Sequence, residues 1–421
     1  MKILSLLEGE NKMGKLNIIG LGYIGLPTSL MFAANGVEVV GTDLNTNLVD
    51  TLNQGKLTFE EEGLEEVFNK ALAKGITFKT EYEKTNRYII TVPTPYMSMT
   101  KQIDAKYVIA ATKQVLEVCE PNTILVIEST ISPGTIDKFV RPIIEEKGLK
   151  IGEDIHLVHA PERIIPGKMV YELENNSRTI GADSRKVGEE VKSWYESFCK
   201  NEIVVTDIKT AEMSKVVENT FRDINIAFAN ELAKMCDREG MDVYELIRIA
   251  NKHPRVNILT PGPGVGGHCI SVDPWFLVGD YPDIVNVVLG AREVNDAMPQ
   301  YVFDKIHKIM KENNIKDYSK VGLYGLTYKE NVDDMRESPT LQLLDIFEKY
   351  NVDKVKVYDP FISEKKFENQ VMNLDCFLSD IELVVVLVSH DEIKSNQELL
   401  KDKVIYDTRN IIKCGKKIYK I

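Results

Sequence analysis

The sequence predicts an α/β protein in which two doubly wound domains are joined by a helical middle region with a long connecting helix. Short apolar segments of strand length alternate with helical segments up to residue 208, and again after residue 312. Such alternation is typical of parallel sheets covered by helices on both faces. Between the two regions, residues 210–239 contain neither proline nor glycine and keep a helical spacing of apolar side chains. This stretch predicts one helix that crosses between the domains.

Length and composition agree with several domains and exclude some functions. A chain of 421 residues exceeds what one core usually supports. We expect an arm at 1–14, an α/β domain at 15–208, a helical region at 209–312 and a second α/β domain at 313–421. The net charge of −12 argues against a nucleic-acid binder. No apolar run is long enough for a membrane span or a signal peptide. Six scattered cysteines without a CxxC pair predict no disulfide scaffold, no metal site and a cytoplasmic location.

The first domain opens with a strand at 16–19, a glycine-rich turn, a helix at 26–35 and a strand at 37–41. The turn has the dinucleotide fingerprint, in which glycines permit the tight turn, the approach of a pyrophosphate and close helix packing. Asp43 follows the second strand, where a carboxylate accepts hydrogen bonds from ribose hydroxyls and repels a 2′-phosphate. We therefore predict a Rossmann-like domain that binds NAD. The alternative is a glycine turn of some other α/β protein. The predicted cofactor residues are Gly20, Gly22, Tyr23, Ile24, Gly25 and Asp43.

The remaining elements follow in order along the chain. In the first domain we expect strands at 88–92, 123–128, 155–160 and 203–206, and helices at 61–74, 105–119, 135–147 and 184–198. In the middle region we expect helices at 242–251 and 283–311, and Pro299 can interrupt the second of these. In the second domain we expect strands at 321–326, 355–359, 383–388 and 403–407. A helix at 338–349 would be capped by Ser338, with Pro339 in its first turn.

Two places in the middle region carry residues suited to chemistry. Cys269 follows a glycine-rich loop at 261–267 that lets a ligand approach, although an isolated cysteine is more often a buried apolar residue. Its neighbour His268 points to the opposite side in an extended chain, which argues against a Cys–His pair. Lys215 and Asn219 share one face of the long helix and could stabilise an oxyanion, or could be a solvated face. Asp273 could act as a base, or could simply open a turn.

The loop at 329–339 follows a strand of the second domain and carries Lys329 and Arg336. Ligands of such sheets bind at the carboxyl ends of the strands, and two cations there suit a diphosphate. A solvated charged loop is the alternative interpretation.

Taken in order, these motifs resemble the UDP-glucose/GDP-mannose dehydrogenase family from about Lys15 to the C-terminus. An ordered set of this kind is very specific, whereas one motif alone could arise by chance. The matching segments are 20–25 with Asp43, the Ser-Thr-Ile-Ser-Pro-Gly-Thr of 129–135, the Pro-Glu-Arg-Ile-Ile-Pro-Gly of 161–167, Lys215 with Asn219, Arg255, the Gly-Gly-His-Cys of 266–269, the Gly-Leu-Thr-Tyr-Lys of 325–329, and 334–339.

The resemblance implies a reaction and residue roles. Members of this family oxidise the C6 alcohol of a nucleotide sugar to a carboxylate by passing two hydrides, one at a time, to two NAD⁺. Cys269 would attack the intermediate aldehyde, and the resulting thiohemiacetal would be oxidised to a thioester that water hydrolyses. Lys215 and Asn219 would stabilise the oxyanion. Glu162, Thr130 and Asp273 would position or activate water.

The resemblance also implies binding roles and partners. Arg255 would reach the substrate of a neighbouring subunit, so we expect a homodimer or a higher homo-oligomer, with the central region providing dimerisation and the catalytic loop. The C-terminal domain would bind the UDP-sugar, and no nucleic-acid or membrane partner is expected. Thr94, Thr130 and Arg336 would join the cofactor site. The substrate site would comprise Glu162, Arg163, Lys215, Asn219, Arg255, Gly266 and Lys329.

Within the family, residues 253–276 are most similar to the branch that oxidises UDP-N-acetyl-D-mannosamine. His268 and Val272 stand where the glucose branch has serine and lysine. Oxidation of UDP-N-acetylglucosamine or UDP-glucose is the alternative within the family. A two-electron hydroxyacid dehydrogenase would need neither Cys269 nor the second α/β domain. A nucleotide-binding regulator that has kept the pockets is disfavoured by Cys269, Lys215, Asn219 and Asp273.

Overall fold

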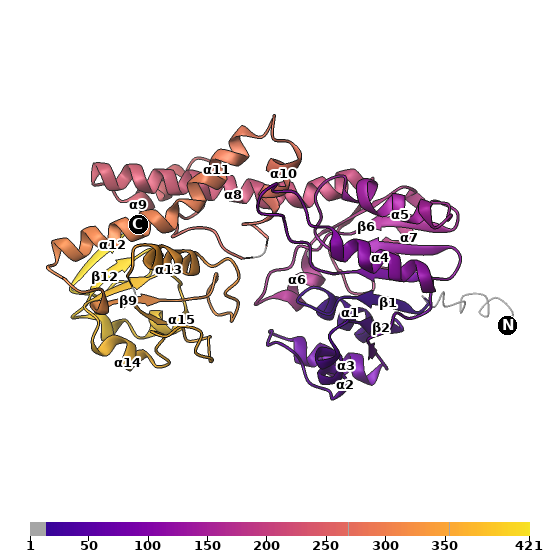
Figure 1. Cartoon of the computed structure of the whole chain (residues 1–421), viewed down its shortest axis with the longest axis horizontal. Coiled ribbons are helices and arrows are strands. Elements are labelled where there is room, and N and C mark those ends of the chain that lie inside the picture. The colour runs from indigo at the N-terminus through magenta and orange to yellow at the C-terminus, as the bar shows by residue number, and fades with distance from the viewer. Residues whose placement is uncertain (1–13, 268, 353) are drawn as a thin grey trace. The chain divides into compact units, whose positions relative to one another are not determined.

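The computed structural model describes residues 14–267, 269–352 and 354–421, and the chain divides after Val216 into two compact units (Figure 1). The arm expected at 1–14 thus lies outside the described residues except for Gly14, and His268 also lies outside them. In the part of the chain that is described, each unit is built around one sheet.

The first unit contains an eight-stranded sheet, counted over its described residues, in the order β3-β2-β1-β4-β5-β6-β7-β8. The chain starts at the central β1, moves outward to β3, returns to β4 beside β1 and continues to β8 at the other edge. This reversal creates a switch point between β1 and β4, where α/β sheets bind ligands at the carboxyl ends of their strands. The strands are β1 (Leu16–Ile19), β2 (Val39–Thr42), β3 (Thr77–Lys79), β4 (Arg87–Ile90), β5 (Thr123–Ile127), β6 (Ile155–His159), β7 (Arg178–Ala182) and β8 (Ile203–Thr206).

Helices cover both faces of this sheet. α1 connects β1 to β2 and α4 connects β4 to β5 in the opposite direction, so right-handed crossovers place them on opposite faces. Burial on both faces explains why β1 and β5 are buried at every position and read as short apolar runs. The helices are α1 (Gly25–Ala34), α2 (Thr46–Asn53), α3 (Leu64–Ala73), α4 (Lys106–Val118), η1 (Ile136–Val140), α5 (Arg141–Glu146), α6 (Met169–Asn175) and α7 (Arg185–Tyr195).

One strand pair differs from the expected parallel sheet. β7 runs antiparallel to β6, with Val158 opposite Ala182 and His159 opposite Gly181. The connection between them is a loop and the seven-residue α6, neither of which was expected from the sequence. The connection spans residues 160–177, which is long enough for a parallel crossover, so the antiparallel direction follows from the path of this segment and not from its length.

The long helix expected at 210–239 is present as α8 (Ile208–Glu239), and the boundary between the units falls within it. The helix expected at 283–311 is divided at Ala297 into two helices. Pro299 lies in the first turn of the second of these, where its missing N–H removes no helical hydrogen bond. The helices of this region are α9 (Val243–Ala250), α10 (Asp273–Asp280), α11 (Asn286–Asp296) and α12 (Met298–Glu312).

The second unit contains a sheet that is parallel throughout, in the order β10-β9-β11-β12-β13. Its switch point lies between β9 and β11, so the order β10-β9-β11-β12 repeats the order β2-β1-β4-β5. The predicted fold class of two doubly wound domains is therefore confirmed. The elements are η2 (Tyr318–Lys320), β9 (Val321–Tyr324), α13 (Pro339–Lys349), β10 (Lys356–Tyr358), α14 (Leu374–Ser379), β11 (Leu383–Val386), α15 (Asp391–Ser395), η3 (Gln397–Leu400), β12 (Val404–Asp407) and β13 (Lys417–Lys420).

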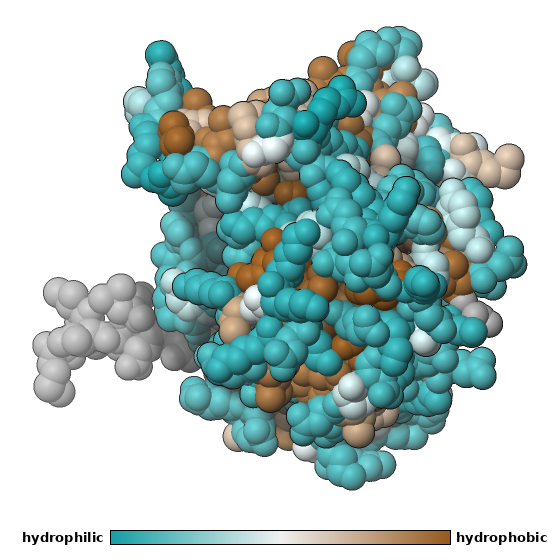
Figure 2. Space-filling view, turned by 90° about the vertical axis from the view of Figure 1, so that its left-hand side faces the viewer, coloured by the Kyte–Doolittle hydropathy of each residue, from teal (hydrophilic) through white to brown (hydrophobic). Residues whose placement is uncertain are grey.

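The surface is mainly polar on the face drawn in Figure 2, where apolar side chains show in smaller areas between hydrophilic ones. Among the residues that the structure describes, no helix combines the length and the apolar character that a membrane crossing requires.

Candidate active site

The glycine turn between β1 and α1 has the geometry of a phosphate-binding turn. Gly20 has a φ of +92°, and its N–H donates to the carbonyl of Thr42 at 2.7 Å. A Cβ on Gly25 would lie 1.8 Å from the carbonyl oxygen of Gly20, so this position accepts only glycine. A Cβ on Gly22 would meet no atom within 4 Å, which leaves open space at the position where the fingerprint brings a pyrophosphate to the backbone.

Asp43 is linked to the same turn. Its Oδ2 accepts the N–H of Leu21 at 2.8 Å, and its Oδ1 accepts the N–H of Asn45 at 2.8 Å. The residue is half-buried, so the carboxylate is fixed in place and still reachable from solvent. An oriented carboxylate beside an open glycine turn and the N-terminus of α1 fits the ribose and pyrophosphate of NAD.

Thr94 and Thr130 follow neighbouring strands, β4 and β5, and contact each other. The Thr94 hydroxyl donates to the carbonyl oxygen of Thr130 at 2.5 Å. The structure thus brings together two residues that the resemblance assigned to the cofactor site, at the carboxyl edge of the sheet.

Glu162 lies in a buried charged cluster that sequence reasoning did not find. Its Oε1 accepts the N–H of Arg163 at 2.6 Å, and its Oε2 forms an ion pair with Arg178. Arg178 also pairs with Glu128 at 3.2 Å, and the Tyr195 hydroxyl donates to Glu128 at 3.0 Å. Burial raises the pKa of Glu128 to about 7. The Glu162 carboxylate is therefore held by the Arg178 guanidinium, in the loop that follows β6.

The guanidinium of Arg163 is directed at β7. Its Nη2 donates to the hydroxyl of Thr179 at 2.9 Å and its Nη1 to the carbonyl of Ser177 at 3.4 Å. These contacts place a predicted substrate-binding residue against a strand that the sequence did not predict.

Lys215 is buried on α8, one turn after a second carboxylate that sequence reasoning missed. Glu212 accepts the N–H of Gly134 at 2.6 Å and the N–H of Ile136 at 3.0 Å, and so ties α8 to the turn after Thr130. Burial raises the pKa of Glu212 to about 7. No motif could have indicated this contact, because the partners are backbone groups more than seventy residues away.

In the second unit, the structure brings Asn219 and Asp273 into contact close to Cys269. The Asn219 amide donates to Asp273 Oδ2 at 2.5 Å, and both side chains are buried. The carbonyl of Cys269 accepts the N–H groups of Val272 at 3.0 Å and of Asp273 at 2.8 Å, so the turn at Cys269 leads directly into α10. Cys269 itself is exposed, so the alternative interpretation of a buried apolar cysteine is wrong.

The glycine-rich loop packs against the loop that carries Arg336. A Cβ on Gly266 would lie 2.6 Å from the carbonyl oxygen of Glu337, and the N–H of Gly267 donates to the Arg336 carbonyl at 3.1 Å. The Arg336 guanidinium forms a two-pronged pair with Asp334, with its Nη2 2.6 Å from Oδ2. The cysteine loop and this arginine are therefore neighbours within the second unit.

Lys329 and Arg255 complete the predicted set. Lys329 is half-buried in the loop after β9. Arg255 is exposed in the turn after α9, and no contact of its side chain with another predicted residue is found within the described part of the unit. Its proposed role toward a neighbouring subunit stays a prediction.

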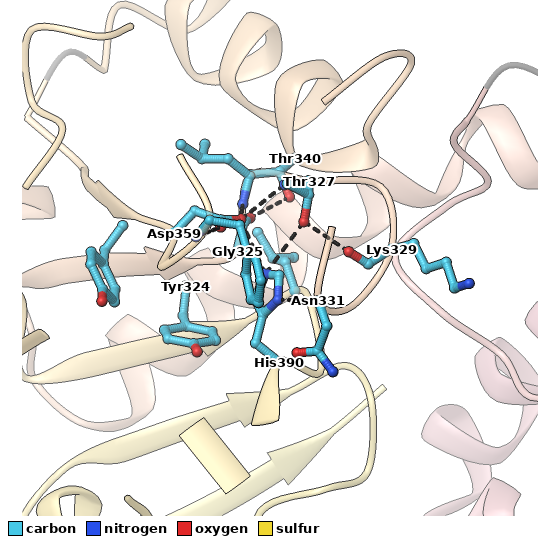
Figure 3. A network of polar contacts seen from close by, with 12 residues as sticks. Tyr324, Gly325, Thr327, Lys329, Asn331, Thr340, Asp359 and His390 are labelled. Carbon is cyan, nitrogen blue, oxygen red and sulfur yellow. Dashed lines mark hydrogen bonds and ion pairs between the residues drawn. The ribbon is translucent and has the colours of Figure 1, made fainter. Parts of the chain in front are cut away.

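A polar network lies behind the Lys329 loop (Figure 3) and was not predicted. The buried Asp359 accepts the N–H groups of Leu326 at 2.6 Å and Thr327 at 3.0 Å through Oδ2, and His390 Nε2 lies 3.1 Å from the same oxygen. The other ring nitrogen of His390 accepts the N–H of Asn331 at 3.0 Å.

Three family models match the chain over most of its length. All three belong to the UDP-glucose/GDP-mannose dehydrogenase family. Its NAD binding domain matches residues 14–199, its central domain residues 209–297 and its UDP binding domain residues 322–414.

Individual relatives match nearly the whole chain. The UDP-N-acetyl-D-mannosamine dehydrogenase of Methanococcus vannielii is 43% identical over 415 residues, which cover 96% of this chain and 94% of that protein. The NDP-N-acetyl-D-galactosaminuronic acid dehydrogenase of Ralstonia nicotianae is 40% identical over 408 residues, with 94% and 96% covered. The solved structure of the UDP-N-acetyl-mannosamine dehydrogenase of Staphylococcus aureus has a TM-score of 0.87 and 41% identity, with 97% of this chain and 98% of that chain covered. The resemblance and the NAD cofactor are thereby confirmed, and the chain belongs to the UDP-glucose/GDP-mannose dehydrogenase family of NAD-dependent oxidoreductases.

Proposed function

We propose that this enzyme oxidises the C6 alcohol of UDP-N-acetyl-D-mannosamine to the carboxylate in two steps, through a thioester on Cys269. The family establishes the coarser activity, NAD-dependent oxidation of a UDP-sugar. The observation that carries the finer proposal is the contact between Asn219 and Asp273 next to the exposed Cys269. Asn219 on α8 contacts Asp273, and the backbone N–H of Asp273 donates to the carbonyl of Cys269, so two polar side chains are held near the exposed cysteine, as a nucleophile with supporting groups would require.

NAD⁺ supplies a hydride acceptor at C6 when it is bound. The chain's own part is to hold and orient it. The open glycine turn with Asp43 is proposed to take the pyrophosphate and ribose, and Thr94 with Thr130 to line the same edge of the sheet. Arg336 is proposed to assist near the cofactor or the diphosphate.

The covalent part of the reaction follows from the chemistry of Cys269. After C6 has become an aldehyde, the thiolate adds to it, and the new C–S bond leaves a negative charge on the former carbonyl oxygen. Lys215 and the Asn219 amide are proposed to stabilise that oxyanion. Loss of a second hydride from C6, to a second NAD⁺, gives a thioester. Water then attacks the thioester, the C–S bond breaks, and the carboxylate and the free thiolate are released.

Asp273 is the proposed base for the hydrolytic water, because its carboxylate is held by Asn219 at the start of α10. Glu162 is proposed to position water rather than to accept its proton. Its carboxylate already forms an ion pair with Arg178 and accepts the N–H of Arg163, and these two contacts fix its orientation.

Substrate binding is proposed to use residues of the C-terminal domain, of the central loops and of the loop after β6. Lys329 would contact the diphosphate, Arg163 and Gly266 would shape the sugar site, and Arg255 would reach the substrate of a neighbouring subunit. The match to a UDP binding domain over residues 322–414 supports the placement of Lys329.

A homo-oligomer is proposed as the working form. α8 presents a row of large apolar side chains to solvent, and such an exposed row favours a second copy of the chain as its cover. Its members are Val217, Phe221, Phe228 and Met235. A cytoplasmic location is also proposed, and the six free cysteines are consistent with a reducing compartment.

The test is a panel of nucleotide sugars with NAD⁺. UDP-N-acetyl-D-mannosamine should have the highest kcat/KM and should release two NADH per acid formed, with the acid identified by mass spectrometry. UDP-glucose and UDP-N-acetylglucosamine should be poor substrates. The N-acetylgalactosamine analogue belongs in the panel, because the relative from Ralstonia nicotianae is nearly as similar as the one from Methanococcus vannielii. A higher kcat/KM for any competitor would reject the proposed sugar.

A further inference from the structure

The two sheets share a local plan at their switch points. In each sheet, the last residue of the central strand pairs with the last residue of both neighbouring strands, so the strand ends can be matched one to one. These end residues are Ile19, Thr42 and Ile90 in the first sheet and Tyr324, Tyr358 and Val386 in the second.

The turn after the central strand is also repeated. Gly20 and Gly325 have φ values of +92° and +97°, and both N–H groups donate to the last carbonyl of the neighbouring strand, at 2.7 and 2.8 Å. An aspartate follows that neighbouring strand in each case. Asp43 accepts the N–H of the residue after Gly20 at 2.8 Å, and Asp359 accepts the N–H of the residue after Gly325 at 2.6 Å. Asp359 is therefore the counterpart of the carboxylate proposed to bind the ribose of NAD.

The two carboxylates differ in what covers them. Asp43 is half-buried, whereas Asp359 is only 3% exposed, and His390 Nε2 lies 3.1 Å from its Oδ2. His390 stands four residues after the end of β11, and Thr94 stands four residues after the end of β4. In the second domain, the His390 imidazole thus contacts the Asp359 carboxylate. In the first domain, the residue at the matching position is Thr94, and its hydroxyl bonds to Thr130 instead.

His390 also holds the loop that carries Lys329. Its Nδ1 accepts the N–H of Asn331 at 3.0 Å, so its proton is on Nε2 and faces Asp359. Asn331 has a φ of +57°, which is unusual for a residue other than glycine. The hydroxyl of Thr327 donates to the carbonyl of Lys329 at 2.9 Å, and the Lys329 side chain extends away from the network (Figure 3). The N–H of Thr327 donates to Asp359, so the backbone is bonded on both sides of Lys329.

We infer that His390 and Asp359 are positioning residues that lock the loop 326–331, so that Lys329 is presented to the diphosphate of the UDP-sugar. The contact with His390 also blocks Asp359 from a ribose, whereas the corresponding Asp43 of the first domain stays accessible. The C-terminal domain therefore takes no second dinucleotide. This inference rests on the proposed role of Lys329.

Three substitutions at His390 separate the contact of Nδ1 with Asn331 from the contacts of Nε2 with Asp359 and Thr327. His390→Asn keeps an acceptor for the N–H of Asn331, His390→Gln keeps a donor for Asp359, and His390→Leu keeps neither. With the enzyme saturated in NAD⁺, UDP binding should weaken about tenfold or more in His390→Leu, or about 1.4 kcal/mol, and less in the other two. KM for the UDP-sugar should rise in parallel, with kcat and KM for NAD⁺ changed less than about twofold.

Tyr324→Phe is the matched control. It removes a hydrogen bond from the same buried region, that of the Tyr324 hydroxyl with Glu392 at 3.2 Å, but it leaves the contacts of His390 with Asp359 and Asn331. UDP affinity should remain that of the wild type. Should His390→Leu fail to fold, the asparagine and glutamine variants decide. Wild-type UDP affinity in both would overturn the inference.

A double-mutant cycle tests whether His390 acts through Lys329. In a Lys329→Ala background, His390→Leu should weaken UDP binding little further, since the side chain that the loop presents is already gone. Full additivity of the two losses in UDP affinity, or no effect of Lys329→Ala, would overturn the inference. A wild-type enzyme that neither binds UDP nor oxidises a UDP-sugar would instead reject the proposed function itself. Calorimetry with NAD⁺ alone should give one site per chain, and two sites would contradict the closure of the second domain.

Discussion

Replacing Glu212 by glutamine should remove a pH-dependent loss of stability from the first unit. Burial raises the pKa of Glu212 from 4.5 to about 7, although the N–H groups of Gly134 and Ile136 oppose this rise. The folded state therefore keeps a proton on this carboxyl over a range in which the unfolded state has released it. Stability must fall as the pH rises from about 4.5 to about 7, and it should level off above that range.

The magnitude follows from the two pKa values. Between pH 5 and pH 8, the free energy of unfolding should fall by about 2.5 kcal/mol through this one group. Glutamine does not titrate, so Glu212→Gln should lack this fall. The variant also sets an amide N–H against one of the two backbone N–H groups, which costs about 1–3 kcal/mol at both pH values. The informative quantity is therefore the difference between the two pH values in each protein.

Urea unfolding at pH 5 and pH 8 measures this difference. Trp194 lies in α7 of the first unit and Trp275 in α10 of the second, so fluorescence in a Trp275→Phe background reports the first unit. Glu65→Gln, at an exposed position of α3 in the first unit, is the matched control and should behave like the background protein. If Glu212→Gln lost as much stability on going to pH 8 as the background protein does, the titration would not belong to Glu212.

Three predictions concern the active site. Asp43→Ser should relax the preference for NAD⁺ over NADP⁺ by at least tenfold in the ratio of kcat/KM, because a carboxylate repels a 2′-phosphate; equal use of both cofactors by the wild type would contradict this. Cys269→Ser should bind both ligands but lose acid formation by orders of magnitude, since serine is a far weaker nucleophile at neutral pH. Near wild-type production of the acid by that variant would remove the covalent mechanism. Inactive Arg255→Ala and Cys269→Ala chains should regain activity when mixed, measured as NADH formation, and failure with verified subunit exchange would favour self-contained sites.

Local patterns in the sequence were sufficient for the fold class and the glycine turn. The Gly20–Gly25 spacing, the strand before it and Asp43 after the next strand lie within one short segment, so the geometry is encoded locally. The long α8 could be read from the absence of glycine and proline. Cys269 was identified through the glycine-rich loop and the family resemblance, and its role stays a prediction.

The remaining contacts depend on partners that only tertiary structure brings together. Arg178 begins β7, a strand that the sequence did not predict, and its partners Glu128 and Glu162 follow two other strands. His390 and Asp359 are thirty-one residues apart and show no motif. The antiparallel direction of β7 depends on the path of residues 160–177, which no local propensity determines.

The exposure of Cys269 has a consequence for chemical labelling of the enzyme. Of the six cysteines, Cys269 and Cys376 are exposed, Cys119 and Cys414 are half-buried, and Cys199 and Cys236 are buried. An alkylating reagent should therefore modify two sites first, and total thiol loss would overcount active sites. In a Cys376→Ser background, one fast-reacting thiol should remain, and its modification would count functional subunits directly, chain by chain.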